Sequence, residues 1–249
     1  MENKLALVTG SAKGIGAATI KEFARNNYDV VIHYNSSERD AKNLEQFIKQ
    51  NYSVNILTIK CDLTNEKEIK DMITKIIEKF HHIDVLVNNA SLEITSEFEN
   101  KNKQDFMNVL DTNIIAPFIL SRGVSKYMLE NKYGKIVNIT SNNAINKYDP
   151  STLEYDASKA ALISLTHNLA LELAPTINVN AVAPGWVMTE KVSCLNDTLD
   201  GMLEQEEKKN ILIERFATPE EVAKLVYFLC TEDARSINNQ VITIDGGTR

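Results

Sequence analysis

A glycine-rich turn, Thr9-Gly10-Ser11-Ala12-Lys13-Gly14-Ile15-Gly16, joins the first apolar run of the chain, 5–9, to an amphipathic segment that begins at residue 15. Glycine lets a backbone turn tightly and approach a ligand closely, because it has no Cβ. A helix that starts at such a turn offers free N–H groups and the positive end of its dipole to a phosphate group. Placed between a strand and a helix, the turn predicts a pyrophosphate site, with a purely structural turn as the alternative.

The strand–helix pattern of this first unit continues along the chain. Short runs rich in valine, isoleucine and leucine predict strands over 5–9, 30–34, 56–60, 85–88, 135–140, 179–183 and 241–245. Amphipathic segments predict helices over 15–26, 39–50, 66–80, 103–131, 152–173 and 219–229, with Thr64 and Thr218 as caps. Strands that alternate with helices predict right-handed crossovers and a parallel sheet covered on both faces. No linker divides the chain, so we expect one α/β domain over 1–249 with a doubly wound, Rossmann-type sheet of about seven strands.

Composition narrows the class of protein. The chain has 249 residues, a hydrophobic fraction of 43% and a formal charge of −7, so no basic surface points to nucleic acid as a partner. Neither a signal-peptide pattern at the amino terminus nor an apolar run of membrane-spanning length is evident. The three cysteines have no disulfide, redox or zinc spacing, and the four histidines have no metal or triad spacing. We therefore expect a cytoplasmic protein with free thiols and no metal or membrane partner.

One tyrosine–lysine pair could carry acid–base chemistry. Of the eight tyrosines, only Tyr155 has a lysine four residues later, Lys159. On a helix these two side chains share a face, and a nearby ammonium lowers the pKa of a phenol from its ordinary value of about 10. By itself the spacing more often means a lysine that snorkels beside a half-buried ring, and the motifs described next favour the catalytic interpretation.

Further motifs give the chain a resemblance to the short-chain dehydrogenase/reductase family. The Gly-x-x-x-Gly-x-Gly spacing of the turn, Asn88-Asn89-Ala90 after the fourth predicted strand and Asp245-Gly246-Gly247 near the carboxyl terminus are similar to the motifs of that family, although Ser91 replaces a usual glycine. The resemblance implies a catalytic tetrad of Asn113, Ser141, Tyr155 and Lys159. Ser141 stands one residue farther from Tyr155 than is common, and Asn142 keeps the common spacing with a less suitable side chain.

The same resemblance implies the cofactor-binding residues. They come from the glycine turn, the ends of the next strands, the catalytic pair and the start of the substrate loop: Gly10, Ser11, Lys13, Gly14, Ile15, Gly16, Asn35, Ser36, Asp62, Leu63, Asn89, Ala90, Tyr155, Lys159, Pro184, Gly185, Val187 and Thr189. Asp62 would contact the adenine ring.

The charge at the end of the second predicted strand favours NADP(H) over NAD(H). Enzymes that bind NAD commonly place an acid there to hold the ribose hydroxyls. Here the strand ends in Asn35 and Ser36, and no carboxylate comes before Glu38. Lys13 could meet a 2′-phosphate, with Asn35 and Ser36 as hydrogen-bond donors. A solvated lysine and NAD(H) remain the alternative.

By resemblance, the chemistry is hydride transfer coupled to proton transfer. Tyr155 would donate a proton to a substrate carbonyl oxygen, or act as the base in the reverse direction. Lys159 would bind the nicotinamide ribose and lower the pKa of Tyr155. Ser141 would hold the carbonyl oxygen, and Asn113 would position a water that resupplies the proton. Backbone hydrogen bonding is the alternative role for Ser141 and Asn113.

The segment of about 185–215 is the least regular part of the sequence and follows a predicted strand directly. Because ligands of such folds bind at the carboxyl ends of the strands, we expect it to be a mobile substrate loop, with an ordinary surface excursion as the alternative.

Several substrate classes fit the sequence. Length and motif order most resemble bacterial 3-oxoacyl-acyl carrier protein reductases, which implies an acyl-thioester or other small-molecule substrate and a homotetramer. Lys132 matches a position that meets the carrier protein, but Leu171 replaces a second expected basic residue. Pteridine reductases and sugar or steroid dehydrogenases of the same family are alternatives. An NADP-sensing protein without catalysis is another, against which the intact tetrad argues.

Overall fold

A computed structural model describes residues 3–248 of the chain, and Met1, Glu2 and Arg249, at the ends of the predicted domain, lie outside the described residues. Seven parallel strands form one sheet in the order β3-β2-β1-β4-β5-β6-β7. This order confirms the predicted doubly wound α/β fold. The strands are β1 Leu5–Val8, β2 Asp29–Tyr34, β3 Ile56–Lys60, β4 Val85–Asn88, β5 Gly134–Ile139, β6 Ile177–Pro184 and β7 Val241–Ile244.

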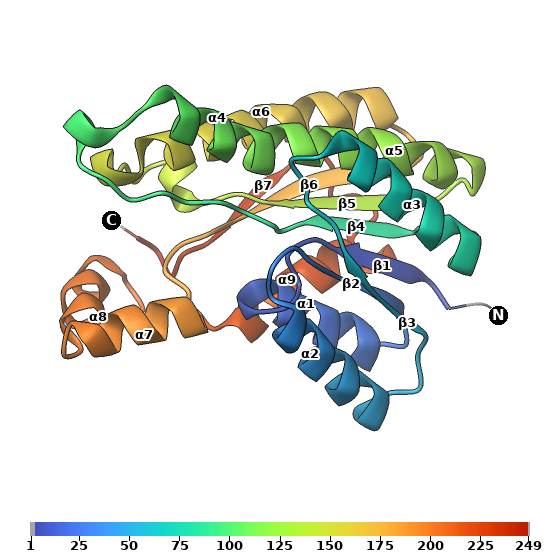
Figure 1. Cartoon of the computed structure of the whole chain (residues 1–249), viewed down its shortest axis with the longest axis horizontal. Helices are drawn as coiled ribbons and strands as arrows, with labels where there is room; N and C mark the ends of the chain where they lie inside the picture. Colours follow the sequence, from blue (N-terminus) through green and yellow to red (C-terminus); the bar gives the residue numbers. More distant parts are fainter. Residues whose placement is uncertain (1–2, 249) are drawn as a thin grey trace.

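Helices cover both faces of the sheet. They are α1 Gly14–Arg25, α2 Glu38–Asn51, α3 Glu66–Phe80, α4 Lys103–Leu110, α5 Ala116–Glu130, α6 Leu153–Leu173, α7 Glu190–Thr198, α8 Met202–Glu207 and α9 Pro219–Leu229. Figure 1 shows α3, α4, α5 and α6 on one face and α1, α2 and α9 on the other, with α7 and α8 standing apart at one side. No helix within residues 3–248 is long and apolar enough to cross a membrane.

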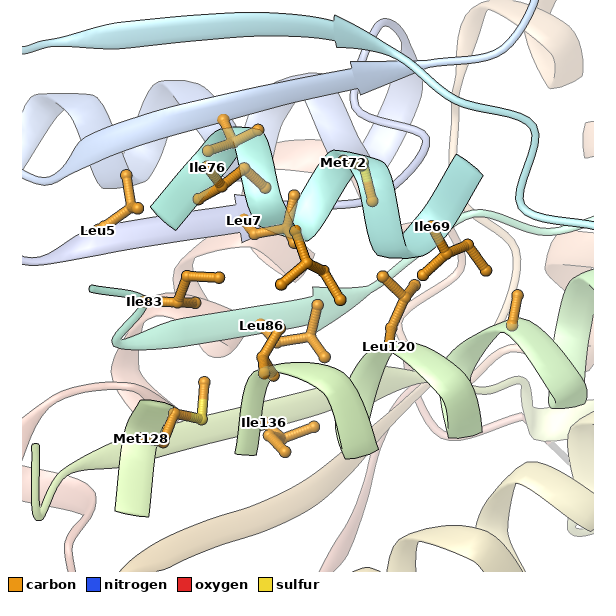
Figure 2. Close-up of a cluster of buried hydrophobic side chains, with 14 of the residues drawn as sticks. Leu5, Leu7, Ile69, Met72, Ile76, Ile83, Leu86, Leu120, Met128 and Ile136 are labelled. Carbon is orange, nitrogen blue, oxygen red and sulfur yellow. The ribbon is translucent and has the colours of Figure 1, made fainter. Parts of the chain in front are cut away.

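Side chains that alternate along each strand divide the core into two layers. Leu5 and Leu7 of β1 face the layer under α3 and α5, where side chains from β1, β4 and these helices meet (Figure 2). Ala6 and Val8 face the opposite layer, which lies under α1, α2 and α9. Because both faces are buried, the strand reads as a continuous apolar run rather than an alternating one.

The strand order places a crevice at the carboxyl ends of β1 and β4. The chain leaves β1 towards β2 and β3 and then crosses to β4 on the other side of β1. The loops that follow β1 and β4 therefore diverge and leave room between them for a ligand. The glycine turn follows β1, and Asn89 and Ala90 follow β4.

The helix predicted over 103–131 is confirmed in extent but is not one regular α-helix, because a π-helical turn over Asp111–Ile115 separates α4 from α5. Pro117 has no N–H to give to the carbonyl of Asn113, four residues earlier, so a regular α-helix cannot continue through this point. Such wide turns are frequent at functional sites. This one contains the buried Asn113.

Two local predictions are wrong: the lack of helices in 185–215 and the cap residue of α3. The segment 185–215 is not irregular, since it contains α7 and α8. Neither helix has a buried residue, so neither shows the apolar period by which a helix is recognised in sequence. The cap of α3 is Asn65 rather than Thr64, because the Asn65 side chain accepts hydrogen bonds from the N–H groups of Lys67 and Glu68. The cap of α9 is Thr218 as predicted, in a capping box with Glu221.

Candidate active site

The glycine turn packs too tightly to accept larger residues. Gly10 has a φ of 60°, and a Cβ there would lie 2.9 Å from the Cα of Ala90. A Cβ on Gly16 would lie 2.6 Å from the carbonyl oxygen of Gly10. The turn therefore owes its shape to the absence of these side chains.

Asn89 and Ala90 hold the turn from the β4 side. The hydroxyl of Thr9 accepts hydrogen bonds from the backbone N–H groups of Asn89, at 2.9 Å, and of Ala90, at 3.0 Å. The side-chain amide of Asn89 donates back to the carbonyls of Thr9, at 2.9 Å, and Gly10, at 3.2 Å. These bonds join the two loops that form the crevice.

His33 holds the turn from the β2 side, a role that the sequence did not reveal. Its Nδ1 accepts a hydrogen bond from the N–H of Gly10 at 2.9 Å, which requires the neutral tautomer with hydrogen on Nε2. Nε2 then donates to the carbonyl of Cys61 at 3.0 Å. Burial lowers the pKa of His33 to about 4, so the ring is neutral near pH 7. Ser11 completes the connection, because its N–H donates to the His33 carbonyl at 3.0 Å and its hydroxyl accepts from the His33 N–H at 3.0 Å.

The amino terminus of α1 is left open to a ligand. Its cap residue, Lys13, makes no side-chain cap bond, and the first turn holds no acidic residue. The free N–H groups and the helix dipole therefore favour an anion here. The turn borders a cavity of about 650 Å³, lined by eight of the predicted cofactor residues, Gly10, Lys13, Asn35, Ser36, Asp62, Leu63, Asn89 and Ala90. This cavity and the open helix terminus fit a dinucleotide with a pyrophosphate.

Lys13 already has an acidic neighbour. Its Nζ lies 2.9 Å from Oδ2 of Asp40 in α2, and its side chain is 59% exposed. An anion near Asn35 and Ser36 would therefore compete with Asp40 for the ammonium. No other acid is close enough to Lys13, within the described residues, to form an ion pair with it.

The remaining predicted cofactor residues lie around the turn and at the start of the segment that carries α7. Ile15 and Gly16 belong to the first turn of α1. A Cβ on Gly14 would lie 3.3 Å from Cγ2 of Thr189, the cap residue of α7. Gly185 follows Pro184 at the end of β6, and Val187 is buried and pairs with Ala217. The α7 segment therefore begins directly against the glycine turn.

Tyr155 and Ser141 face each other. Tyr155 is half-buried near the start of α6, and Ser141 follows β5 and is 8% exposed. Burial raises the pKa of Tyr155 above its ordinary value, Glu93 raises it further, and a hydrogen bond with Ser141 lowers it. The structure does not show the expected lowering by Lys159, because burial is the largest influence on the pKa of Tyr155 and only the hydrogen bond with Ser141 lowers it. Oγ of Ser141 also accepts from the N–H of Asn143 at 3.2 Å. It is thus Ser141, not Asn142, that contacts Tyr155.

Lys159 lies under the tyrosine ring. Its Nζ is 5.4 Å from the centre of the Tyr155 ring and donates to the carbonyl of Ile139 at 2.8 Å. The side chain is 2% exposed, and burial lowers the pKa of Lys159 to about 8. An ammonium has three hydrogens, so two remain for other acceptors.

The side chain of Asn113 is occupied by protein partners. Its Oδ1 accepts from the N–H of Leu92 at 2.8 Å, and its Nδ2 donates to the carbonyl of Leu92 and the hydroxyl of Ser158, both at 2.9 Å. Leu92 and Thr112 also line the cavity, so Asn113 joins α6, which carries Tyr155, to the crevice. A water held by Asn113 could use the second lone pair of Oδ1 or the main-chain carbonyl that Pro117 leaves without its α-helical donor.

Within residues 3–248 no group of three or more His, Cys, Asp or Glu side chains could hold a metal ion.

Comparison with known proteins gives consistent matches over almost the whole chain. A family model described as enoyl-(acyl carrier protein) reductase matches residues 10–249. A 3-oxoacyl-[acyl-carrier-protein] reductase, FabG, of Aquifex aeolicus is 35% identical over 99% of this chain and 98% of its own. The solved structure of ElxO with NADP bound has a TM-score of 0.91 and 33% identity, over 98% of each chain. A mutant short-chain dehydrogenase/reductase of Serratia marcescens has a TM-score of 0.89 and 29% identity, over 99% of this chain and 98% of that one.

Proposed function

Because the chain belongs to the short-chain dehydrogenase/reductase family of oxidoreductases, which act on CH–OH groups, we propose that it interconverts a carbonyl and a secondary alcohol with NADP(H). The observation that carries the proposal is the contact of Tyr155 with Ser141 above the buried Lys159, beside a cavity that fits a dinucleotide. When bound, a reduced nicotinamide supplies the hydride.

Tyr155 is the proposed proton donor. Its raised pKa keeps the phenol protonated near neutral pH, so that a proton is present for a carbonyl oxygen that gains negative charge. Ser141 supplies a second, neutral donor to the same oxygen, since its own oxygen already accepts from Asn143. The two hydroxyls thus define where the reacting oxygen sits.

Lys159 and Asn113 support the proton transfer. With one hydrogen on Ile139, Lys159 has two left for the ribose of the cofactor and for a water. Its pKa near 8 lets it pass a proton towards Tyr155 at neutral pH. Asn113 fixes the geometry through Leu92 and Ser158, and a relay water would take an acceptor atom that these bonds leave free.

NADP(H) is the proposed cofactor. The cavity brings Lys13, Asn35 and Ser36 together at the end of β2, where a 2′-phosphate would find one ammonium and polar side chains. The NADP bound in ElxO, a structural relative, supports the same preference.

We propose a 3-oxoacyl thioester as the substrate class. The support is the 35% identity to the 3-oxoacyl-[acyl-carrier-protein] reductase of Aquifex aeolicus. Lys132 is exposed and could meet an acidic carrier protein, but Leu171, where a second basic residue was expected, is 74% exposed and apolar. We therefore place the thioester ahead of the carrier protein as the feature recognised.

The domain organisation, oligomeric state and location of the protein are also proposed. We propose one domain over 1–249, with 185–215 acting as a lid over the substrate, and a homotetramer built through α5 and α6. Free cysteines at 61, 194 and 230 support a reducing, cytoplasmic location.

A panel of substrates tests the function. Purified protein is mixed with NADPH and, separately, acetoacetyl-coenzyme A, a dihydropteridine, a sugar and a steroid ketone, and the loss of NADPH absorbance is followed. We expect the highest kcat/KM with acetoacetyl-coenzyme A, and no turnover in a Tyr155→Phe control. A preference for the dihydropteridine, sugar or steroid would overturn the substrate class. NADPH binding without turnover of any compound would instead favour a sensing protein.

A further inference from the structure

Glu93 follows a residue whose backbone is fixed to α6, the helix that carries the proposed catalytic pair. It follows Leu92, whose N–H and carbonyl are both bound by the side chain of Asn113. Asn113 is fully buried, so it cannot move without breaking its bond to Ser158 in the tyrosine helix. The backbone that carries Glu93 is therefore held to the same element that carries Tyr155 and Lys159.

The charge of Glu93 reaches both members of the pair. It raises the pKa of Tyr155 and the pKa of Lys159, and it is the largest charged influence on each. Asp156 also raises the pKa of Tyr155. Its carboxylate accepts hydrogen bonds from the side-chain amide of Asn143 and from the N–H of Asp149, both at 2.9 Å. Ser141 is the remaining polar group that acts on Tyr155.

Glu93 has a partner on α7. Nζ of Lys191 lies 3.2 Å from Oε1 of Glu93, and the two side chains are 75% and 36% exposed. An exposed ion pair of this kind contributes little to stability, so it forms and breaks easily. Because Thr189 lies against Gly14 and Lys191 reaches Glu93, the start of α7 connects the glycine turn to the loop that follows β4.

No residue of α7 is buried, and the helix stands apart from the two helix layers (Figure 1). Few packed side chains resist its movement, which is the character of a segment that opens locally. If α7 moves, Lys191 moves with it, while the backbone of Leu92, which precedes Glu93, stays held by Asn113.

We propose that Glu93 is an electrostatic positioning residue whose charge is balanced by Lys191, so that docking of α7 sets the net charge beside the Tyr155–Lys159 pair. With α7 docked, the ion pair directs the carboxylate towards the lid. With α7 open, the carboxylate of Glu93 is unpaired, and its negative charge makes the Tyr155 hydroxyl and the Lys159 ammonium harder to deprotonate. This rests on the proposed roles of Tyr155 and Lys159, and it makes lid position and proton transfer interdependent.

The test reads Lys159 directly and needs no substrate. Protein labelled at the lysine Cε carbon with 13C is titrated by NMR between pH 6 and 10, with Lys159→Arg to assign the signal. We expect Glu93→Gln to lower the pKa of Lys159 and Lys191→Met to raise it, each by about half a pH unit. In the Glu93→Gln background, Lys191→Met should add almost nothing.

A matched control removes another lysine of the same segment. Lys209 pairs with Glu206 at 2.8 Å, away from Glu93, so Lys209→Met should leave the Lys159 titration unchanged. The proposal is overturned if Glu93→Gln leaves the titration unaltered, or if Lys191→Met shifts it equally with and without Glu93. Since no turnover is measured, either failure is distinct from a failure of the proposed reaction.

Discussion

At the scale of single residues, the site depends on polar side chains that form hydrogen bonds with other groups of the protein. Nδ1 of His33, the side-chain amide of Asn89 and the hydroxyl of Thr9 hold the glycine turn, and the Asn113 side chain binds Leu92 and Ser158. Lys13 is different, because its ion-pair partner, Asp40, competes directly with the proposed ligand. Substitution of a residue that only holds the turn should weaken NADPH and NADH binding alike, whereas substitution of Lys13 should weaken NADPH binding alone.

Lys13→Ala should weaken NADPH binding about tenfold to a hundredfold and leave NADH binding almost unchanged, because only NADPH has a 2′-phosphate to lose a charge-assisted bond. Asp40→Asn should tighten NADPH, since it frees the ammonium. Fluorescence titration of both cofactors measures the effect. Equal losses for NADPH and NADH in Lys13→Ala would show that Lys13 does not read the phosphate.

His33 should make folding stability sensitive to acid. Its pKa is about 4 in the folded protein and about 6.5 when unfolded, so the unfolded chain binds more protons between these values and stability falls as pH drops through them. Between pH 7 and pH 5 this contributes a loss of about 2 kcal/mol. Urea unfolding of wild type and His33→Gln at both pH values isolates the effect. An equal acid loss in His33→Gln would contradict it.

At the scale of secondary-structure elements, the sequence predicts what packing enforces and misses what lacks a periodic signal. The strands and the helices α1, α2, α3, α6 and α9 lie within two residues of their predicted bounds, because each buries an apolar face or is fully buried. Helices α7 and α8 were missed because they bury nothing. The π-helical turn was missed because Pro117, which causes it, lies in the first turn of α5. Proline is common at that position of ordinary helices, so it does not indicate a π turn.

The same division applies to the site. Glycine spacing and the Tyr155–Lys159 spacing are local in sequence and could be predicted. The contacts of His33 with Gly10 and of Glu93 with Lys191 join residues 23 and 98 positions apart, and no pattern at either end indicates the other. Burial, which sets the pKa of Tyr155 against the expected influence of Lys159, is likewise a property of the folded chain.

At the scale of the whole molecule, the exposed apolar residues favour assembly. Phe118 and Leu129 of α5 are 40% and 45% exposed, and Leu171 of α6 is 74% exposed. Apolar side chains on neighbouring helices are the usual material of an interface between copies. We expect light scattering to give four times the chain mass of 28.0 kDa, and Leu171→Glu to lower it. A wild-type protein that stays monomeric would contradict the proposed homotetramer.

Proton donation by Tyr155 is the step on which the proposed reaction depends most. The decisive measurement compares wild type and Tyr155→Phe for NADPH affinity, by fluorescence titration, and for NADPH oxidation with acetoacetyl-coenzyme A. Removing the hydroxyl should leave NADPH affinity near wild type and lower kcat by about 10²–10⁴-fold, the usual contribution of a positioned acid. A Tyr155→Phe protein that binds NADPH and still turns over at the wild-type rate would contradict the mechanism.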